Sequence, residues 1–311
     1  MRCLIIGGNG YIGSSIATSL MSNHEVHICD AEYFGSPMRD IPQSQTYNYF
    51  PCKIQDLTTS LSIYDVILLF AGHSSVQLCN NYPMEAVENN VYVFKHLVDN
   101  LSTNQKLIYA SSSCVYGTAR EAIESTQVKP TDGLSYSKAF MDYIALNCNK
   151  KVYGLRLGSV CGWSKNFRKD LAVNSMTVDG LTKRQVFVSN PRCCRSFAAI
   201  GDVVLTVKTI MDQDGEPGIY NVASFSDTFG NLAQKIASIT GASLNVQKDT
   251  GTYDFTVVTD KLIKTYGIKL TNTLEDVVMD ITKHQGSISY RPREFILNDP
   301  KDRSLSSLRE R

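Results

Sequence analysis

Three glycines near the N-terminus have the spacing of a phosphate-binding turn. Residues 7–13 read GGNGYIG, which fits both G-x-G-x-x-G and the related G-x-x-G-x-x-G. Glycine permits a tight turn and a close approach of the backbone to a pyrophosphate, and the N–H groups of the helix that follows can bind the phosphates. The residues of this turn that we expect to contact a dinucleotide are Gly7, Gly10, Tyr11, Ile12 and Gly13.

An acidic residue ends the next apolar run. Residues 26–29 are typical of a strand, and Asp30 follows them directly. A carboxylate at this point would accept hydrogen bonds from a ribose diol and would repel a 2′-phosphate, so the sequence favours NAD over NADP. The alternative is a purely structural glycine turn with a surface aspartate, and the strand–turn–helix setting argues against it.

These groups need a scaffold, and the first half of the chain alternates short apolar runs with helical patterns. We expect strands at 3–6, 26–29, 47–52, 66–70, 106–110 and 152–157, and helices at 11–21, 84–100 and 135–147. The run at 66–70 is wholly apolar, which is typical of a strand buried on both faces. This rhythm predicts an α/β fold with a doubly wound parallel sheet of the Rossmann type.

After about Gly162 the rhythm becomes irregular. Strand-like pieces remain at 185–188, 218–222 and 243–247, and helical patterns at 202–211, 228–240 and 273–284. We expect residues 1–162 to form an NAD-binding domain. Residues 163–290 are then a smaller C-terminal, substrate-binding lobe with elements that return to the sheet, and 291–311 are a charged peripheral tail.

Composition excludes several classes of protein. The chain is 43% hydrophobic and 20% charged, which suits a globular protein with a large core, and its net charge of +1 argues against nucleic acid or a charged membrane surface as partner. No apolar run is long enough to cross a bilayer. The nine cysteines and five histidines lack metal-ligand spacing, so we expect no metal site. Without a signal-peptide pattern, reduced thiols in the cytoplasm are expected.

Further motifs occur in order along the chain. They are Gln55-Asp56-Leu57, Phe70-Ala71-Gly72, Asn90, ASSSCVYG at 110–117, Ser137-Lys138, Arg195-Ser196-Phe197 followed by Asp202, and GIYNV at 218–222. Together they resemble the extended short-chain dehydrogenase/reductase family, in its NAD-dependent epimerase/dehydratase branch, over about residues 1–280. The segment at 70–72 is very similar to that of UDP-galactose 4-epimerases.

The resemblance implies a bound NAD and a set of residues that hold it. Asp56 and Leu57 would contact adenine. Phe70, Ala71 and Gly72 would lie beside the phosphates and ribose, Asn90 occupies a helix position of the family's cofactor site, and Lys138 would bond the nicotinamide ribose. In these enzymes a tyrosine removes a sugar hydroxyl proton while NAD takes the carbon hydride, and the lysine helps to lower the tyrosine pKa.

The resemblance also implies substrate contacts. Ser112 takes the position of the catalytic hydroxyl, three residues before Val115, with Ser113 as a neighbour that could substitute for it. Arg195 would bind the diphosphate of a nucleotide sugar, because a planar cation suits phosphate oxygens. Asn174, in a segment resembling R-x-D-L-x-V-N, would bond the diphosphate or the adjoining sugar.

One position departs from the family pattern Y-x-x-x-K. The tyrosine should lie at residue 134, which is Leu134, and a tyrosine occurs at Tyr136 instead. Residues four apart share a helix face, whereas residues two apart point about 200° away from each other. The apolar stripe of Tyr136, Phe140 and Tyr143 therefore predicts the buried face, with Tyr136 in the core. Tyr136 could serve as the catalyst only if the helix began irregularly.

These observations predict an NAD-dependent nucleotide-sugar epimerase, UDP-hexose 4-epimerase-like, that works through a transient keto sugar. Dehydratases often carry Asp and Glu directly after the catalytic hydroxyl residue, and here those positions are Ser113 and Cys114, so 4,6-dehydration is disfavoured. Leu134 keeps open a non-catalytic binder of NAD or nucleotide sugar, and a reductase of keto sugars is a third alternative. The resemblance implies a homodimer formed through helices at about 84–100 and 135–148.

Overall fold

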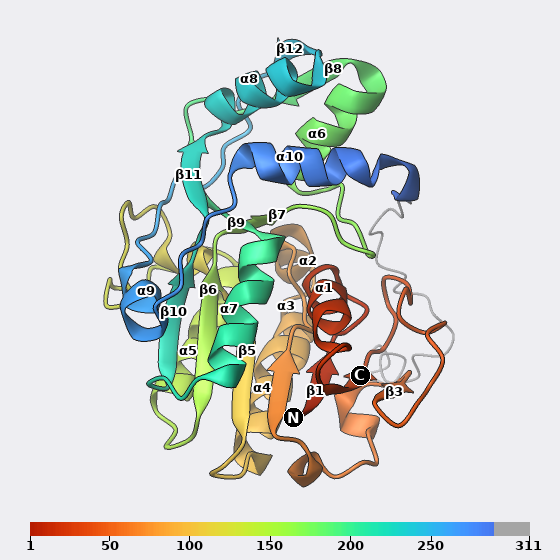
Figure 1. The fold of residues 1–311 in the computed structure, drawn as a ribbon. Helices are drawn as coiled ribbons and strands as arrows, with labels where there is room; N and C mark the ends of the chain where they lie inside the picture. Colours follow the sequence, from red (N-terminus) through yellow and green to blue (C-terminus); the bar gives the residue numbers. More distant parts are fainter. Residues whose placement is uncertain (289–311) are drawn as a thin grey trace, which may run out of the picture.

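A parallel sheet forms the centre of the computed structural model, which describes residues 1–288; the expected tail at 291–311 lies outside the described residues. The seven strands lie in the order β10-β6-β5-β4-β1-β2-β3, and every neighbouring pair is parallel. Their bounds are β1 Arg2–Ile6, β2 Glu25–Cys29, β3 Tyr47–Phe50, β4 Val66–Leu69, β5 Lys106–Ser112, β6 Val152–Leu157 and β10 Gly218–Val222. The doubly wound sheet expected from the sequence is confirmed (Figure 1).

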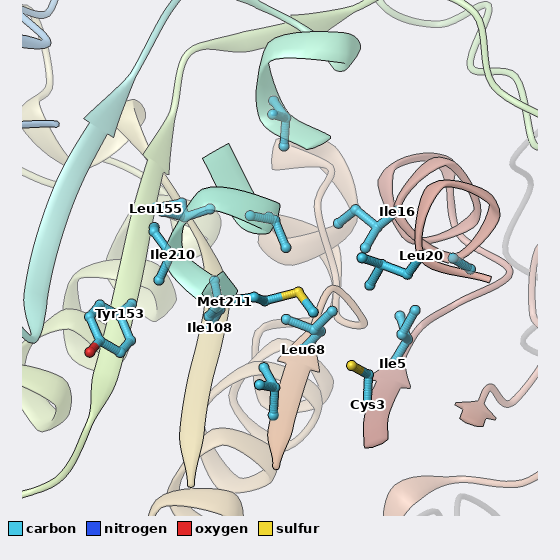
Figure 2. Packing of buried hydrophobic residues seen from close by; sticks show 14 of the residues in the cluster. Cys3, Ile5, Ile16, Leu20, Leu68, Ile108, Tyr153, Leu155, Ile210 and Met211 are labelled. Carbon is cyan, nitrogen blue, oxygen red and sulfur yellow. The ribbon is translucent and has the colours of Figure 1, made fainter. Parts of the chain in front are cut away.

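Successive strand residues point to opposite faces, and helices bury both faces. On one face, α1 (Tyr11–Leu20) and α7 (Ile200–Asp212) pack together over the sheet. Figure 2 shows Leu20 of α1 near Ile5 of β1, and Ile210 and Met211 of α7 near Leu155 of β6 and Ile108 of β5, all in one apolar cluster. The other face is covered by α4 (Val93–Asn100) and α5 (Gly133–Leu146).

A smaller lobe lies beyond the carboxyl ends of the strands (Figure 1). It contains a three-stranded sheet, a two-stranded sheet and three helices around their own apolar cluster. The elements are β7 Ser159–Cys161, β9 Cys194–Ala199, β11 Phe225–Thr228, β8 Gln185–Val188, β12 Ser243–Val246, α6 Ala172–Lys183, α8 Phe229–Thr240 and α10 Leu274–Lys283. The short α9 (Asp260–Tyr266) packs beside β10, which itself returns to the central sheet.

The helix expected at 84–100 is present, but it is not a regular α-helix throughout. It begins at Pro83 as α3 (Pro83–Ala86), passes through a π-helical turn, η3 (Val87–Tyr92), and continues as α4. The separate α2 (Val76–Asn81) precedes it, because Pro83 interrupts the helical pattern. Among the elements that the sequence pattern did not indicate are α6, β7 and β9.

The expected orientation of α5 is wrong. Its aromatic stripe faces solvent, with Tyr136 60%, Phe140 54% and Tyr143 62% exposed, whereas Leu134, Lys138 and Asp142 are buried. The two charged residues can be buried because residues of the neighbouring strands bond to them. Lys138 Nζ donates to the Ala110 carbonyl at 2.7 Å, and Arg156 pairs with Asp142 at 2.8 Å.

Candidate active site

A cavity of about 900 Å³ lies at the carboxyl ends of the central strands, where ligands bind in open parallel sheets. Its walls come from the turn after β1, the ends of β2, β4 and β5, the first turns of α5, and three segments of the smaller lobe. Four cationic side chains and two carboxylates line it among the described residues: Lys53, Lys138, Arg168 and Arg195, with Asp30 and Asp170. This balance suits a ligand that carries phosphates.

The glycine turn forms one end of the cavity. Gly7 has φ +84°, a left-handed conformation that favours glycine, and its N–H donates to the Cys29 carbonyl. α1 then begins after Gly10 without a side-chain cap, so its first N–H groups are available to an anion. Gly13 does not line the cavity; a Cβ there would lie 2.0 Å from the Gly7 oxygen, so its role is close packing.

Asp30 lies beside this turn and lines the cavity. Its two carboxylate oxygens accept the backbone N–H groups of Asn9 at 2.8 Å and Glu32 at 2.7 Å. Burial raises the pKa of Asp30, and the two N–H bonds partly offset that rise. The carboxylate is thus held rigidly at the end of β2, where the sequence placed a ribose ligand.

The pair Asp56 and Leu57 lies outside the cavity wall. A 3-10 turn, η1 (Ile54–Asp56), follows β3, and Asp56 ends it as an exposed side chain. Lys53, Ile54 and Gln55 line the cavity instead. The adenine-contacting pair expected from the motif is therefore not brought to the site, and the residues just before it are.

Asn90 does not line the cavity but bonds to residues that do. Its amide oxygen accepts the His73 N–H at 2.8 Å, and its amide nitrogen donates to the His73 carbonyl at 3.1 Å and to Ser137 at 2.9 Å. These bonds fix the turn after β4, in which Phe70, Ala71 and Gly72 line the cavity as expected. Asn90 lies in the π-helical turn, an irregularity that often marks functional sites.

The three serines at the end of β5 differ in environment. Ser112 lines the cavity, and its hydroxyl accepts the Cys114 N–H at 3.3 Å. Ser111 also lines the cavity and is buried, and its hydroxyl lacks a hydrogen-bond partner within the described chain. Ser113 is fully buried and donates to the Arg156 carbonyl at 3.0 Å. Ser112 and Ser111 can therefore reach a ligand, and Ser113 supports β6.

Lys138 and Leu134 line the same wall, one turn apart on α5. Burial lowers the pKa of Lys138 to about 8, while the nearby Asp142 carboxylate opposes that fall. Leu134 packs in a small apolar cluster with Cys79 and Cys114. Position 134 thus faces the cavity without a group that can transfer a proton, and Tyr136 is not brought to the site.

Asn174 is not brought into the cavity either. It is fully buried in α6; its amide oxygen accepts the Gly162 N–H at 2.9 Å, and its nitrogen donates to the Tyr11 hydroxyl and the Arg168 carbonyl. Its geometry is that of a positioning residue for Tyr11 and Arg168, both of which line the cavity. Arg168, to which the sequence assigned no role, donates to Ser74 at 3.0 Å and forms an ion pair with Asp170.

Arg195 lines the cavity from β9 of the smaller lobe. Its Nε donates to the Tyr253 carbonyl at 3.0 Å, its terminal nitrogen donates to Thr252, and its guanidinium lies 5.7 Å from the Tyr253 ring centroid. The segment 251–255 therefore forms part of the wall. It carried no motif, and only its enrichment in polar and aromatic residues could have indicated it.

Within residues 1–288, the structure contains no helix of the length and apolar character that a membrane span requires. The same residues contain no group of three or more His, Cys, Asp or Glu side chains arranged to hold a metal ion.

Comparison with known proteins agrees with this geometry. The model of the NAD dependent epimerase/dehydratase family matches residues 3–223. A mouse dTDP-D-glucose 4,6-dehydratase is 26% identical over 273 residues, covering 76% of this chain and 72% of the relative. A UDP-glucose 4-epimerase of Lactobacillus helveticus is 28% identical over 180 residues, covering 53% and 54%. The structure of a UDP-glucuronic acid 4-epimerase from Bacillus cereus, with UDP-glucuronic acid and NAD, superposes with a TM-score of 0.81 at 19% identity, covering 93% and 100%.

Proposed function

We propose, from the premise that this chain belongs to the NAD dependent epimerase/dehydratase family, that it is a UDP-hexose epimerase working through a transient keto sugar. The observation that carries this proposal is one cavity lined by the glycine turn and Asp30 from the ends of β1 and β2, by Ser112 and Lys138 from β5 and α5, and by Arg195 from β9 of the smaller lobe. This sequence of groups fits a dinucleotide followed by a sugar and a second diphosphate.

The residues present fit NAD. The glycine turn and the uncapped start of α1 would hold the pyrophosphate, Asp30 the adenosine ribose and Lys138 the nicotinamide ribose. NAD supplies a reversible hydride acceptor when bound. The chain supplies position: Ser112 offers a hydroxyl to the reacting sugar oxygen, and Lys138, fixed on Ala110, offers positive charge beside it.

Epimerisation is favoured over dehydration by the two residues after Ser112. A dehydratase needs an acid and a base to remove water, and residues 113 and 114 are serine and cysteine. Ser113 is engaged with β6, and burial raises the pKa of Cys114 to about 12, so this thiol is neutral near pH 7. Neither residue can perform the step.

The substrate end suits a nucleotide diphosphate. Arg195 and Arg168 are separated along the chain but line the same cavity. A guanidinium group can make two parallel, charge-assisted hydrogen bonds to phosphate oxygens. We therefore assign them to the diphosphate of the sugar nucleotide, and leave Ser111 and Ser112 for the sugar hydroxyls.

The test is direct. The purified chain is incubated with NAD and, separately, with UDP-glucose, UDP-galactose, UDP-glucuronic acid and dTDP-glucose, and products are identified by proton NMR. We expect a C4 epimer from a UDP sugar and no 4-keto-6-deoxy product from dTDP-glucose. Accumulation of the keto-deoxy sugar would instead assign the dehydratase reaction. A Lys138→Met variant provides the control.

Leu134 favours a second candidate, a binder of NAD and nucleotide sugar that performs no chemistry. It predicts micromolar binding of both ligands by calorimetry without any epimer after prolonged incubation. A measured turnover above that of Lys138→Met rejects it.

We also propose that the chain forms a homodimer in the cytoplasm. The exposed residues of α5, Tyr136, Phe140, Tyr143 and Leu146, make an apolar stripe on one helix, and Phe140 and Tyr143 stack at 6.1 Å between ring centroids. Exposed apolar faces of this kind mark interaction sites, and a second copy of α5 would cover this one symmetrically. All nine cysteines are free, which suits a reducing compartment.

A further inference from the structure

Oxidation of a sugar hydroxyl needs a group that takes its proton, and Leu134 supplies none. The titratable side chains that line the cavity and are connected to α5 include Lys138, Cys114, which packs with Leu134, His73, whose backbone bonds to Asn90 beside α5, and Tyr253, which bonds to Asp132. Lys138 is already bound to the Ala110 carbonyl, and Cys114 is held as a neutral thiol by its burial. Tyr253 and His73 remain as proton acceptors.

Tyr253 comes from the smaller lobe but meets α5 at its first turn. Its hydroxyl donates to Oδ2 of Asp132, the N-cap residue of α5, two positions before Leu134. Thr131 Oγ1 donates to the same phenol oxygen at 3.3 Å. Arg195 holds the backbone and ring of Tyr253 from the other side. The phenol is therefore fixed at the start of α5, in the same cavity wall to which Leu134 contributes.

We propose that Tyr253 is the proton-transfer residue of this site and that Asp132 is its positioning residue and proton acceptor. This inference rests on the proposed epimerase function. It assigns to the loop 251–255 a catalytic role in addition to its place in the substrate wall.

Atoms and electrons balance in this step. The carbinol C–H bond would break with loss of a hydride, and NAD, when bound, would supply the two-electron acceptor for it. The sugar O–H bond breaks, its proton passes to the Tyr253 oxygen, and the phenol proton passes to Asp132 Oδ2, so that a C=O bond forms. Return of the hydride to the opposite face of the carbonyl carbon would reverse both proton transfers and give the epimer.

The environment of Tyr253 suits a relay. Burial and the Asp132 carboxylate raise the pKa of Tyr253, so the phenol stays protonated near neutral pH and passes a proton on while it receives one. His73 is the rival, since burial lowers its pKa and keeps the imidazole neutral. The two bonds from Asn90 hold the backbone of His73, so they do not orient its imidazole toward a substrate.

The first arm measures kcat and KM for the best UDP-hexose. We expect Tyr253→Phe to lower kcat by about 10²–10⁴-fold with little change in KM, and Asp132→Asn, which keeps the helix cap, to lower kcat less. Tyr136→Phe, an exposed tyrosine on the same helix, is the matched control. Tyr253→Phe combined with Leu134→Tyr should regain turnover. Full activity of Tyr253→Phe, or loss of activity only in His73→Asn, overturns the inference while the epimerase function stands.

The second arm needs no turnover. The chain has 16 tyrosines, and incorporation of 3-fluorotyrosine gives each a fluorine resonance; the Tyr253 resonance is the one missing from Tyr253→Phe. UDP-glucose should shift this resonance beyond the shift produced by UDP alone, because the phenol contacts the sugar. Equal shifts with both ligands would overturn the inference. An unmodified chain that converts no nucleotide sugar rejects the proposed function, and the proton relay with it.

Discussion

Tyr136 and Lys138, two residues apart on α5, lie on opposite sides of that helix: Lys138 is 6% exposed in the cavity wall, and Tyr136 is 60% exposed. We therefore expect Tyr136→Phe to leave turnover unchanged.

Leu134→Tyr places a hydroxyl on the Lys138 side of α5 and should raise turnover of a UDP-hexose by about tenfold or more. Epimer formed per unit time gives both results, with folding checked by thermal melting. Loss of activity in Tyr136→Phe would show that α5 begins differently in the working enzyme.

Replacement of Asp30 should change cofactor choice. The unmodified chain is expected to bind NAD(H) more tightly than NADP(H), because the fixed carboxylate repels a 2′-phosphate. Asp30→Ala should narrow that preference, measured by quenching of intrinsic fluorescence. Asp56→Ala is the matched control, since Asp56 is exposed outside the cavity and should change neither affinity. Tighter binding of NADP(H) by the unmodified chain would contradict this assignment.

Arg195→Ala should weaken binding of the nucleotide sugar and leave NAD binding almost intact. Loss of a charge-assisted bond to phosphate costs about 1.5–3 kcal/mol, and the loss of the Arg195 bonds to 252 and 253 loosens the wall as well. Calorimetric titration with UDP-glucose measures the change. Arg192→Ala, at an exposed neighbouring position, should bind normally. Unchanged affinity in Arg195→Ala would mean that the residue only supports the loop.

Lys138 should make stability depend on pH. The unfolded chain keeps this lysine protonated up to its ordinary pKa of 10.5, and the folded chain only up to about 8. Between these values unfolding takes up a proton, so the contribution of Lys138 to the free energy of unfolding rises with pH and is least favourable below pH 8. The free energy of unfolding of Lys138→Met at pH 7 should therefore exceed that of the unmodified chain by about 1–3 kcal/mol. The increase in the free energy of unfolding that Lys138 causes between pH 8 and 10.5 should be absent from this variant.

Urea unfolding of the NAD-free chain at several pH values measures this difference. Lys95→Met serves as the control, because Lys95 lies exposed on α4 in an i,i+4 pair with Asp99. A Lys138→Met variant that is less stable at pH 7 than the unmodified chain would show that the bond to Ala110 outweighs the desolvation of the charge.

The aromatic stripe on α5 should control association. Phe140→Glu introduces a charge among exposed apolar residues and should convert a dimer to a monomer in sedimentation experiments. Ile123→Glu, at an exposed apolar position outside the helix, is the matched control and should sediment as the unmodified chain does. A monomeric unmodified chain at micromolar concentration would contradict the proposed dimer.

The sequence by itself determined the features that depend on neighbouring residues. The glycine turn, the start of α1 and the carboxylate at the end of β2 follow from local spacing, because backbone freedom and helix termini act over a few residues. The apolar runs predicted the parallel strands, since a strand buried on both faces has no polar alternation to obscure it. Ser112 and Lys138 were identified by motif, and both line the cavity.

Only the tertiary structure decided which face of α5 is buried. Amphipathic pattern predicted that the aromatic residues would be inside, because burial of Lys138 and Asp142 is costly when they are considered alone. Arg156 of β6 and Tyr109 of β5 bond Asp142, and the Ala110 carbonyl bonds Lys138. These partners lie in strands of the central sheet and offset the desolvation of Lys138 and Asp142. The sequence pattern of α5 alone contains no information about them.

The same reason applies to Asn174 and Tyr253. A motif placed Asn174 at the substrate, but its three hydrogen bonds to other segments hold it in the interior. Tyr253 belongs to a loop without a motif, and it reaches Asp132, 121 residues earlier in the chain, only after the smaller lobe folds over the sheet. Contacts between residues this far apart in the sequence depend on how the two lobes pack together. The local sequence pattern around each residue does not specify that packing.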